Sequence, residues 1–189
     1  IDELIHSDVF TDTKEQFNMF KLLSGSEGTL AFTTQITLQL DDLQPTESIM
    51  VAAHFKSIEQ CLNSVELVMK HNLYTCEMMD KTILDCTKHN KTQQQNRQFI
   101  LDDPEAILMC EVRGNTLDGV KKQAELLVND IKTSNLSYAY PILIGEEIDK
   151  AVELRKAGLG LLGNIIGDEK SAACIEDTAV TLPDLANYI

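Results

Sequence analysis

Apolar positions along the chain follow two different periods, and the changes of period mark the expected elements. Alternating stretches predict strands, whereas apolar residues three and four apart predict helices. Strands are expected at residues 49–55, 73–79, 106–112 and 137–143. Helices are expected between them, at residues 58–69 and 117–132. Because the order strand, helix, strand occurs twice, we expect an α+β fold: a ferredoxin-like split βαβ antiparallel sheet with both helices on one face.

Local signals support this order and add shorter elements. Ser57 and Gln60 match a capping box at the start of the first helix. A further short helix is expected at residues 80–88, and an exposed, glutamine-rich loop at residues 90–96.

The N-terminal part has a different pattern, in which a glycine bend leads into a long alternating stretch. A short helix is expected at residues 12–22 and a strand at residues 31–40. Gly25 and Gly28 bracket a tight bend that side chains would obstruct, and its free N–H groups would suit an anionic cofactor. Two glycines three apart are also typical of a plain turn. Residues 41–46 indicate a linker and a domain boundary.

A helix expected at residues 144–162 carries a cation among apolar residues. On a helical wheel, Arg155 falls in the middle of one apolar face, three residues after Val152 and four before Leu159. The residues of this face are Ile148, Ala151, Val152, Leu159 and Leu162. A guanidinium stays charged, so a buried one needs an anion. Either a protein carboxylate or the carboxylate of a ligand could supply it, and the helical pattern leaves both interpretations open.

The last expected elements are a short strand at residues 171–175 and a helix that begins at Leu182. Glu176 and Asp177 follow that strand directly. Two adjacent carboxylates at a strand end could pair with a base, cap a helix or act in a site, and these interpretations also stay open.

Composition limits the functions open to the chain. Its 189 residues carry a formal net charge of −14, which argues against nonspecific binding to nucleic acid. No apolar run reaches the length of a membrane span, so no transmembrane segment is expected. The 5 cysteines and 4 histidines show no metal-ligand spacing. We therefore expect reduced, mostly buried thiols, histidines in the core or on the surface, and no metal site within the chain.

With these elements in order, the chain resembles the FAD-linked oxidases of the vanillyl-alcohol-oxidase superfamily. The similar branch contains D-lactate dehydrogenase, the flavoprotein of glycolate oxidase, and D-2-hydroxyglutarate dehydrogenase. Three motifs carry the resemblance, at residues 22–30, 152–159 and 174–180, and a weaker one lies at residues 77–80. The first is similar to the closing signature of the family's FAD domain, and the second to its substrate-domain helix.

The resemblance implies a division of the chain. Residues 1–44 would be the C-terminal end of an FAD-binding (PCMH-type) domain. Residues 45–189 would be most of a substrate (cap) domain, truncated at the C-terminus, with the ferredoxin-like core at about residues 49–143. The full-length parent would be an FAD-dependent oxidoreductase that oxidises a D-2-hydroxy acid of the lactate, glycolate or 2-hydroxyglutarate class by hydride transfer to flavin.

The resemblance also implies roles for individual residues. Arg155 would bind the substrate carboxylate, and Glu176 and Asp177 would lie near the site. FAD would lie near the bend, whose residues are Gly25, Ser26, Glu27, Gly28 and Thr29. No catalytic residue is expected within this chain, because the family's catalytic base belongs to a later, histidine-rich segment.

The departures from the family pattern set further expectations. The family's main pyrophosphate-binding loops find no match here, so the chain is expected to be a fragment that binds FAD poorly and is inactive by itself. The resemblance allows a divalent metal and an iron–sulfur module in downstream segments, and a homodimer. It implies a cytoplasmic protein, with peripheral membrane attachment through the full-length form as an option. The identity of the hydroxy acid and the electron acceptor stay open.

A second interpretation belongs to a different functional class. The βαβ-βαβ pattern is shared by many binding domains, so the chain could be a non-catalytic ferredoxin-like module that binds a small metabolite or another protein. The glycine bend and the Arg155 helix lie outside that pattern and favour the oxidoreductase.

Overall fold

A computed structural model describes residues 18–163, 167, 168, 170 and 178–189 of the chain. The chain divides into two compact units, Ile1–Leu43 and Gln44–Ile189. The second unit holds the sheet and both hydrophobic cores.

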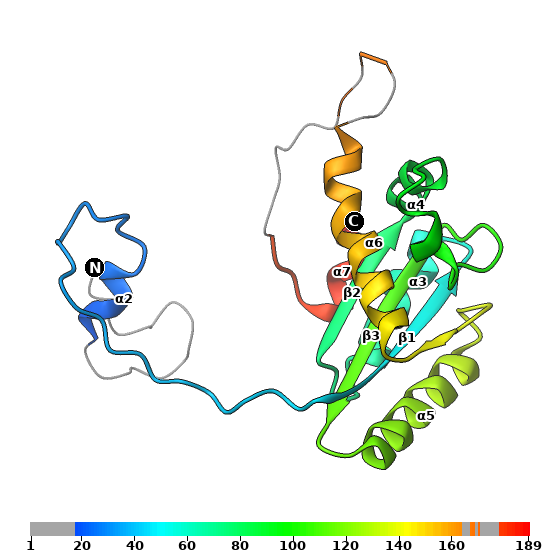
Figure 1. The fold of residues 1–189 in the computed structure, drawn as a ribbon, viewed down its shortest axis with the longest axis horizontal. Coiled ribbons are helices and arrows are strands. Elements are labelled where there is room, and N and C mark those ends of the chain that lie inside the picture. The colour runs from blue at the N-terminus through cyan, green and yellow to red at the C-terminus, as the bar shows by residue number, and fades with distance from the viewer. Residues whose placement is uncertain (1–17, 164–166, 169, 171–177) are drawn as a thin grey trace. The chain divides into compact units, whose positions relative to one another are not determined.

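The sheet of the second unit has the predicted topology. Its strands are β1 (Glu47–Phe55), β2 (Thr75–Asp80), β3 (Ala106–Gly114) and β4 (Ile142–Leu143). They lie in the order β2-β3-β1-β4, and every neighbouring pair is antiparallel. This order is that of the split βαβ fold, which confirms the expected fold class (Figure 1).

The fourth strand is shorter than expected. Only Ile142 and Leu143 form a continuous ladder with β1, and the residues before them make isolated contacts with it. Ala52 N–H donates to the Pro141 carbonyl at 2.9 Å, and His54 forms an isolated bridge with Ala139. Because proline has no N–H to donate, Pro141 interrupts the ladder and the strand pattern of residues 137–143 yields a short strand.

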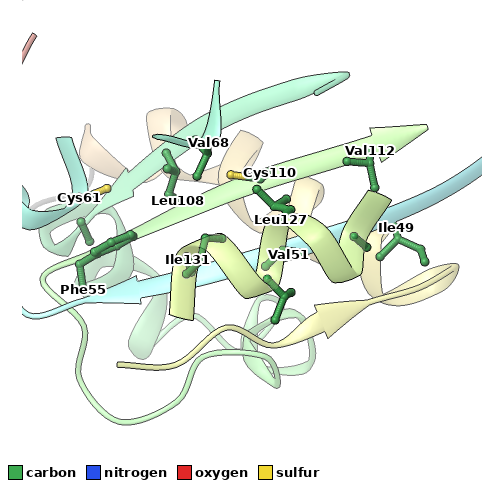
Figure 2. Packing of buried hydrophobic residues seen from close by; sticks show 14 of the residues in the cluster. Ile49, Val51, Phe55, Cys61, Val68, Leu108, Cys110, Val112, Leu127 and Ile131 are labelled. Atoms are coloured by element: carbon green, nitrogen blue, oxygen red, sulfur yellow. The ribbon is translucent and has the colours of Figure 1, made fainter. Parts of the chain in front are cut away.

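The two crossover helices, α3 (Ile58–Val68) and α5 (Leu117–Ser134), pack on the same face of the sheet, as predicted. The Ser57 side chain accepts a hydrogen bond from Gln60 N–H at 3.1 Å, which is the capping interaction expected there. Figure 2 shows α5 placing Leu127 and Ile131 against Val51 and Phe55 of β1.

The opposite face of the sheet is also covered, which the strand and helix order did not predict. Helices α4 (Lys81–Lys88) and α6 (Glu146–Leu162) and the 3-10 turn η1 (Gln94–Arg97) form a second core there. Its buried residues are Met50, Ala52, Met79, Leu84, Phe99, Ile107, Met109, Leu143, Ile148, Ala151 and Leu154. Residues 49–55 and 106–112 are accordingly buried without interruption, since β1 and β3 lie between two layers of helix.

The loop expected to be exposed at residues 90–96 is only partly so. Gln93 and Asn96 are buried, and the Asn96 side-chain amide donates to Gln93 Oε1 at 3.0 Å. Arg97 Nη1 donates to the Leu84 carbonyl at 2.6 Å, which joins η1 to α4. The segment is polar in composition, and its two inward amides, Gln93 and Asn96, are buried and bonded to each other, whereas Gln94 and Gln95 stay exposed.

The first unit departs from its predicted pattern. Helix α2 (Met19–Leu23) begins after the cap residue Asn18, and residues 12–17 of the expected helix lie outside the described residues. The prediction of a strand at residues 31–40 is wrong, because these residues form no strand in the structure. Its apolar side chains are exposed: Phe32, Ile36, Leu38 and Leu40. An alternating pattern becomes a strand only beside a partner, and the described residues of this unit supply none.

A short helical segment begins at Leu182, as predicted. A 3-10 turn, η2 (Leu182–Asp184), passes directly into α7 (Leu185–Tyr188), and both contact α3. The strand expected at residues 171–175 lies outside the described residues.

His54 is a core residue whose hydrogen bonds define its protonation state. The ring is fully buried in β1 and lies edge-on to Phe99 and Tyr138. Its Nδ1 lies 2.8 Å from the Ala52 carbonyl, and Leu101 N–H donates to Nε2 at 3.2 Å. A neutral ring satisfies both contacts, and burial lowers the pKa of His54 below its ordinary 6.5.

We expect the neutral His54 ring to make folding pH-dependent. Below about pH 6.5 the unfolded chain takes up a proton that the folded chain does not bind, so the free energy of unfolding falls as pH falls toward the lowered pKa. The slope is at most about 1.4 kcal/mol per pH unit. Urea unfolding of the wild type and of His54→Gln between pH 5 and 8 checks this. The variant should lose that slope and exposed His89→Gln should retain it, whereas equal slopes in all three would contradict the assignment.

Gly158 allows α6 to approach α4, and this gives a second prediction. A Cβ added at Gly158 would lie 2.5 Å from Ile83 Cγ2, whereas one at Gly160 of the same helix would meet nothing within 4 Å. Gly158→Val should lower the free energy of unfolding by about 1–3 kcal/mol through overpacking. Gly160→Val is the matched control, because it makes the same change on the same helix without the contact. Equal losses in the two variants would show that helix propensity alone is responsible.

Candidate functional site

Helix α6 rests on the sheet through a buried stripe that shares only Ile148 and Ala151 with the predicted apolar face. Its buried residues are Ile148, Ala151, Leu154 and Gly158. Arg155 follows Leu154 directly and therefore lies on the flank of this stripe, with 42% of its side chain exposed. The expectation that Arg155 stands in the middle of a buried apolar face is wrong. The helical-wheel pattern predicts that Val152 is a core position, whereas in the structure Val152 is only half-buried and Leu154 is fully buried.

A carboxylate of the protein faces Arg155. Arg155 Nε lies 2.8 Å from Glu77 Oε2, and the Glu77 side chain is 33% exposed. Glu77 is on β2, opposite Met109 of β3, and alternation puts it on the same face as the buried Met79. Of the two possible anions that the sequence left open, the structure therefore contains the protein one, and it comes from the weakest of the matched motifs, residues 77–80.

A hollow of about 400 Å³ lies beside this ion pair. It is lined by Met78, Met79, Ile83, Arg155 and Lys156. Two adjacent cations thus border an otherwise apolar depression, a combination that suits a small organic anion. A hollow of about 550 Å³ lies by η1 and β4 and is lined among others by Phe99, Tyr138 and Lys150. It is larger, but it does not include Arg155, and it contains none of the residues predicted for a site.

The glycine bend belongs to the first unit and has an open, exposed backbone. Gly28 has a φ of +75° and Glu27 one of 48°, so glycine is needed at position 28 for its conformation. A Cβ at Gly25 or Gly28 would meet nothing within 4 Å. The expectation that side chains would obstruct the bend within the chain is therefore wrong, and the open space leaves room for an approaching group.

The hydrogen bonds of the bend divide its N–H groups into two sets. Ser26 N–H donates to the Leu23 carbonyl at 3.1 Å, and Thr29 N–H donates to the Ser26 carbonyl at 2.9 Å. Among the described residues, no backbone acceptor is found for the N–H groups of Gly25, Glu27 and Gly28. These three donors are what the bend can offer to a ligand.

A second charged cluster, which the sequence analysis missed, lies on the same face of the sheet as Glu77. Glu111 of β3 is 3% exposed, and Arg113 Nε donates to its Oε1 at 2.6 Å. The Arg113 guanidinium also stacks on Tyr74, 3.7 Å from the ring centre. Glu111 is a charged residue inside an otherwise apolar strand, and that interruption of the pattern was the available signal.

Among the residues predicted to lie near the substrate, Arg155 is the one that the structure describes. Glu176 and Asp177 lie outside the described residues, as do Cys174 and His6. The cysteines of the described part are free: Cys61 and Cys110 are buried, and Cys76 and Cys86 are half-buried. In the part of the chain that the structure describes, no three His, Cys, Asp or Glu side chains come together as a metal ion would require. No helix of that part is both long and apolar enough to cross a membrane.

Comparison with known proteins shows which proteins the chain is similar to. Residues 44–189 match the family model for the C-terminal domain of FAD linked oxidases. D-2-hydroxyglutarate dehydrogenase of Haemophilus influenzae is 26% identical, over 96% of this chain and 18% of the relative. Those of Pantoea ananatis and Escherichia coli are 27% and 25% identical, each over 96% of this chain and 19% of the relative.

These matches decide the family and also show how much of a relative the chain represents. The chain spans less than a fifth of the length of these curated relatives. The family match covers the whole of the second structural unit, from its first residue at position 44. The resemblance seen in the motifs is thereby confirmed, and the chain belongs to the FAD-linked oxidases, matching the C-terminal domain of that family.

Proposed function

We propose that this chain is part of an FAD-dependent dehydrogenase that oxidises a D-2-hydroxy acid. The observation that carries the proposal is Arg155, a half-exposed cation at the edge of a hollow in a domain of the FAD-linked oxidase family. The relatives named above are D-2-hydroxyglutarate dehydrogenases, which supports 2-hydroxyglutarate as the first substrate to test, ahead of lactate and glycolate.

Arg155 would bind the carboxylate of the substrate. A guanidinium keeps its charge at every physiological pH and presents a planar fork that matches a carboxylate. The chain as a whole carries a net charge of −14, so an anionic substrate must be attracted by cations close to its site. Arg155 and Lys156 are the cations that border the hollow. Arg155 also remains accessible, because its helix is held to the sheet by Leu154 and not by Arg155 itself.

FAD would lie near the bend formed by Gly25, Ser26, Glu27, Gly28 and Thr29. The open space over both glycines and the three N–H groups without backbone acceptors support this placement. When bound, the flavin would accept the hydride from the substrate. Residues 1–44 would accordingly be the end of the FAD-binding domain and residues 45–189 most of the cap domain, with Glu176 and Asp177 near the substrate.

Further properties of the full-length protein are proposed on the family resemblance. They are a cytoplasmic location, a homodimer, and a divalent metal or iron–sulfur module held by other segments. The free thiols at Cys61 and Cys110 support a reducing compartment.

We expect the isolated 189-residue chain to be colourless and inactive. Its described contribution to a flavin site is one exposed bend, and a cofactor of that size needs contacts on most of its surface. The measurement is the absorption spectrum between 350 and 500 nm of chain purified in the presence of FAD, together with dye reduction by D-2-hydroxyglutarate. A yellow chain that reduces the dye would contradict this expectation.

Replacing Arg155 in the full-length parent tests the proposed substrate role. Arg155→Ala should lower kcat/KM for the D-2-hydroxy acid, because a charge-assisted contact to the carboxylate is lost. The loss should correspond to an increase of about 2–4 kcal/mol in the activation free energy. Flavin content should stay unchanged. Arg155→Lys should recover part of the loss, since it restores charge without the fork.

Lys122→Ala, which removes an exposed cation from α5 on the other face of the sheet, is the control for general charge effects. Should Arg155→Ala and Lys122→Ala behave alike, Arg155 has no part in substrate binding.

A further inference from the structure

We infer that Glu77 is a positioning residue for Arg155, an inference that rests on the proposed function of Arg155. The two side chains meet at 2.8 Å, between Glu77 Oε2 and Arg155 Nε. Nε is the guanidinium nitrogen nearest the aliphatic stem. A contact there does not use the two terminal nitrogens, which form the fork at the far end of the group. No other carboxylate of the described residues forms an ion pair with Arg155.

The backbone on each side of this contact is held by buried neighbours. Glu77 lies within the β2–β3 ladder, opposite Met109, and Met79 next to it on the same face is buried. Arg155 follows the fully buried Leu154 on α6. The ion pair therefore joins a strand and a helix whose backbones are both anchored by buried neighbours.

The need for such a partner follows from the exposure of Arg155. A half-exposed arginine samples many rotamers, and each substrate molecule would have to select the productive one. A carboxylate 2.8 Å from Nε favours the rotamers that keep the opposite charges together, and so reduces that freedom before the substrate arrives. The Glu77 carboxylate approaches the guanidinium from β2. Arg155 also borders the hollow, together with Met79 and Ile83.

The same contact has an opposite interpretation, which makes the inference testable. If Glu77 only neutralises Arg155, then it competes with the substrate carboxylate, and its removal should improve binding. If Glu77 positions Arg155, its removal should weaken catalysis even though an anionic competitor has gone. The two roles therefore predict changes of opposite sign in KM.

The experiment measures steady-state dye reduction by the full-length parent carrying Glu77→Ala, Glu77→Gln, Arg155→Ala or both alanine substitutions. Positioning predicts that Glu77→Ala lowers kcat/KM about ten- to a hundredfold with a raised KM. It also predicts that Glu77→Ala causes no further loss once Arg155 is alanine, because the residue acts only through Arg155. Glu77→Gln should lie between wild type and Glu77→Ala.

Controls separate this role from a structural one. Glu153→Gln removes a carboxylate from the exposed side of the same helix and should leave kcat/KM unchanged. A structural role for Glu77 would instead lower the melting temperature and flavin content, and its effect would multiply with that of Arg155→Ala. Either that multiplicative pattern or a lowered KM in Glu77→Ala overturns the inference.

The outcomes also distinguish this inference from the proposed function. If Arg155→Ala is impaired and Glu77→Ala is not, Arg155 keeps its proposed role and the positioning by Glu77 is rejected. If Arg155→Ala has wild-type kcat/KM, the proposed role of Arg155 fails, and the inference on Glu77 fails with it.

Discussion

The burial of β1 and β3 on both faces is the constraint on which the rest of the second unit depends. Seven consecutive residues in each strand, 49–55 and 106–112, are removed from water. Crossover helices α3 and α5 can cover only one face, so a second layer must cover the other. A fully buried leucine or isoleucine contributes about 1.5–3 kcal/mol, and leaving the face that carries Met50, Ile107 and Met109 in water would forfeit several such contributions.

The second layer is also the one that bears the candidate site. Helix α6 packs its buried stripe on that face, and Gly158 lets it lie close to α4. Arg155 thereby comes to the flank of the helix, beside Glu77 at the edge strand β2. The layer that excludes water from the sheet thus determines where the cation stands and which carboxylate it meets.

The two ion pairs on this face of the sheet differ in their exposure to solvent. Glu111 is buried beneath Arg113, with Tyr74 stacked on the guanidinium, whereas Glu77 and Arg155 are both half-exposed. In the first pair the guanidinium is already engaged by Glu111, Gln44 and Tyr74, and the carboxylate is almost fully removed from solvent. The second pair borders a hollow and can be reached. Accessibility, more than the presence of an ion pair, therefore distinguishes a candidate site from a structural cluster.

The amino-acid sequence by itself determined the strand and helix order, the split βαβ topology, the capping of α3 and the motifs of the family. These features depend on the spacing of residues that are close in the chain, so periodicity is enough to reveal them. Tertiary structure alone decided that both faces of the sheet are covered, that residues 31–40 form no strand among the described residues, and that Arg155 lies beside Glu77. Each of these depends on a partner distant in the sequence: 78 residues separate Glu77 from Arg155, and no local pattern specifies which carboxylate a cation will meet.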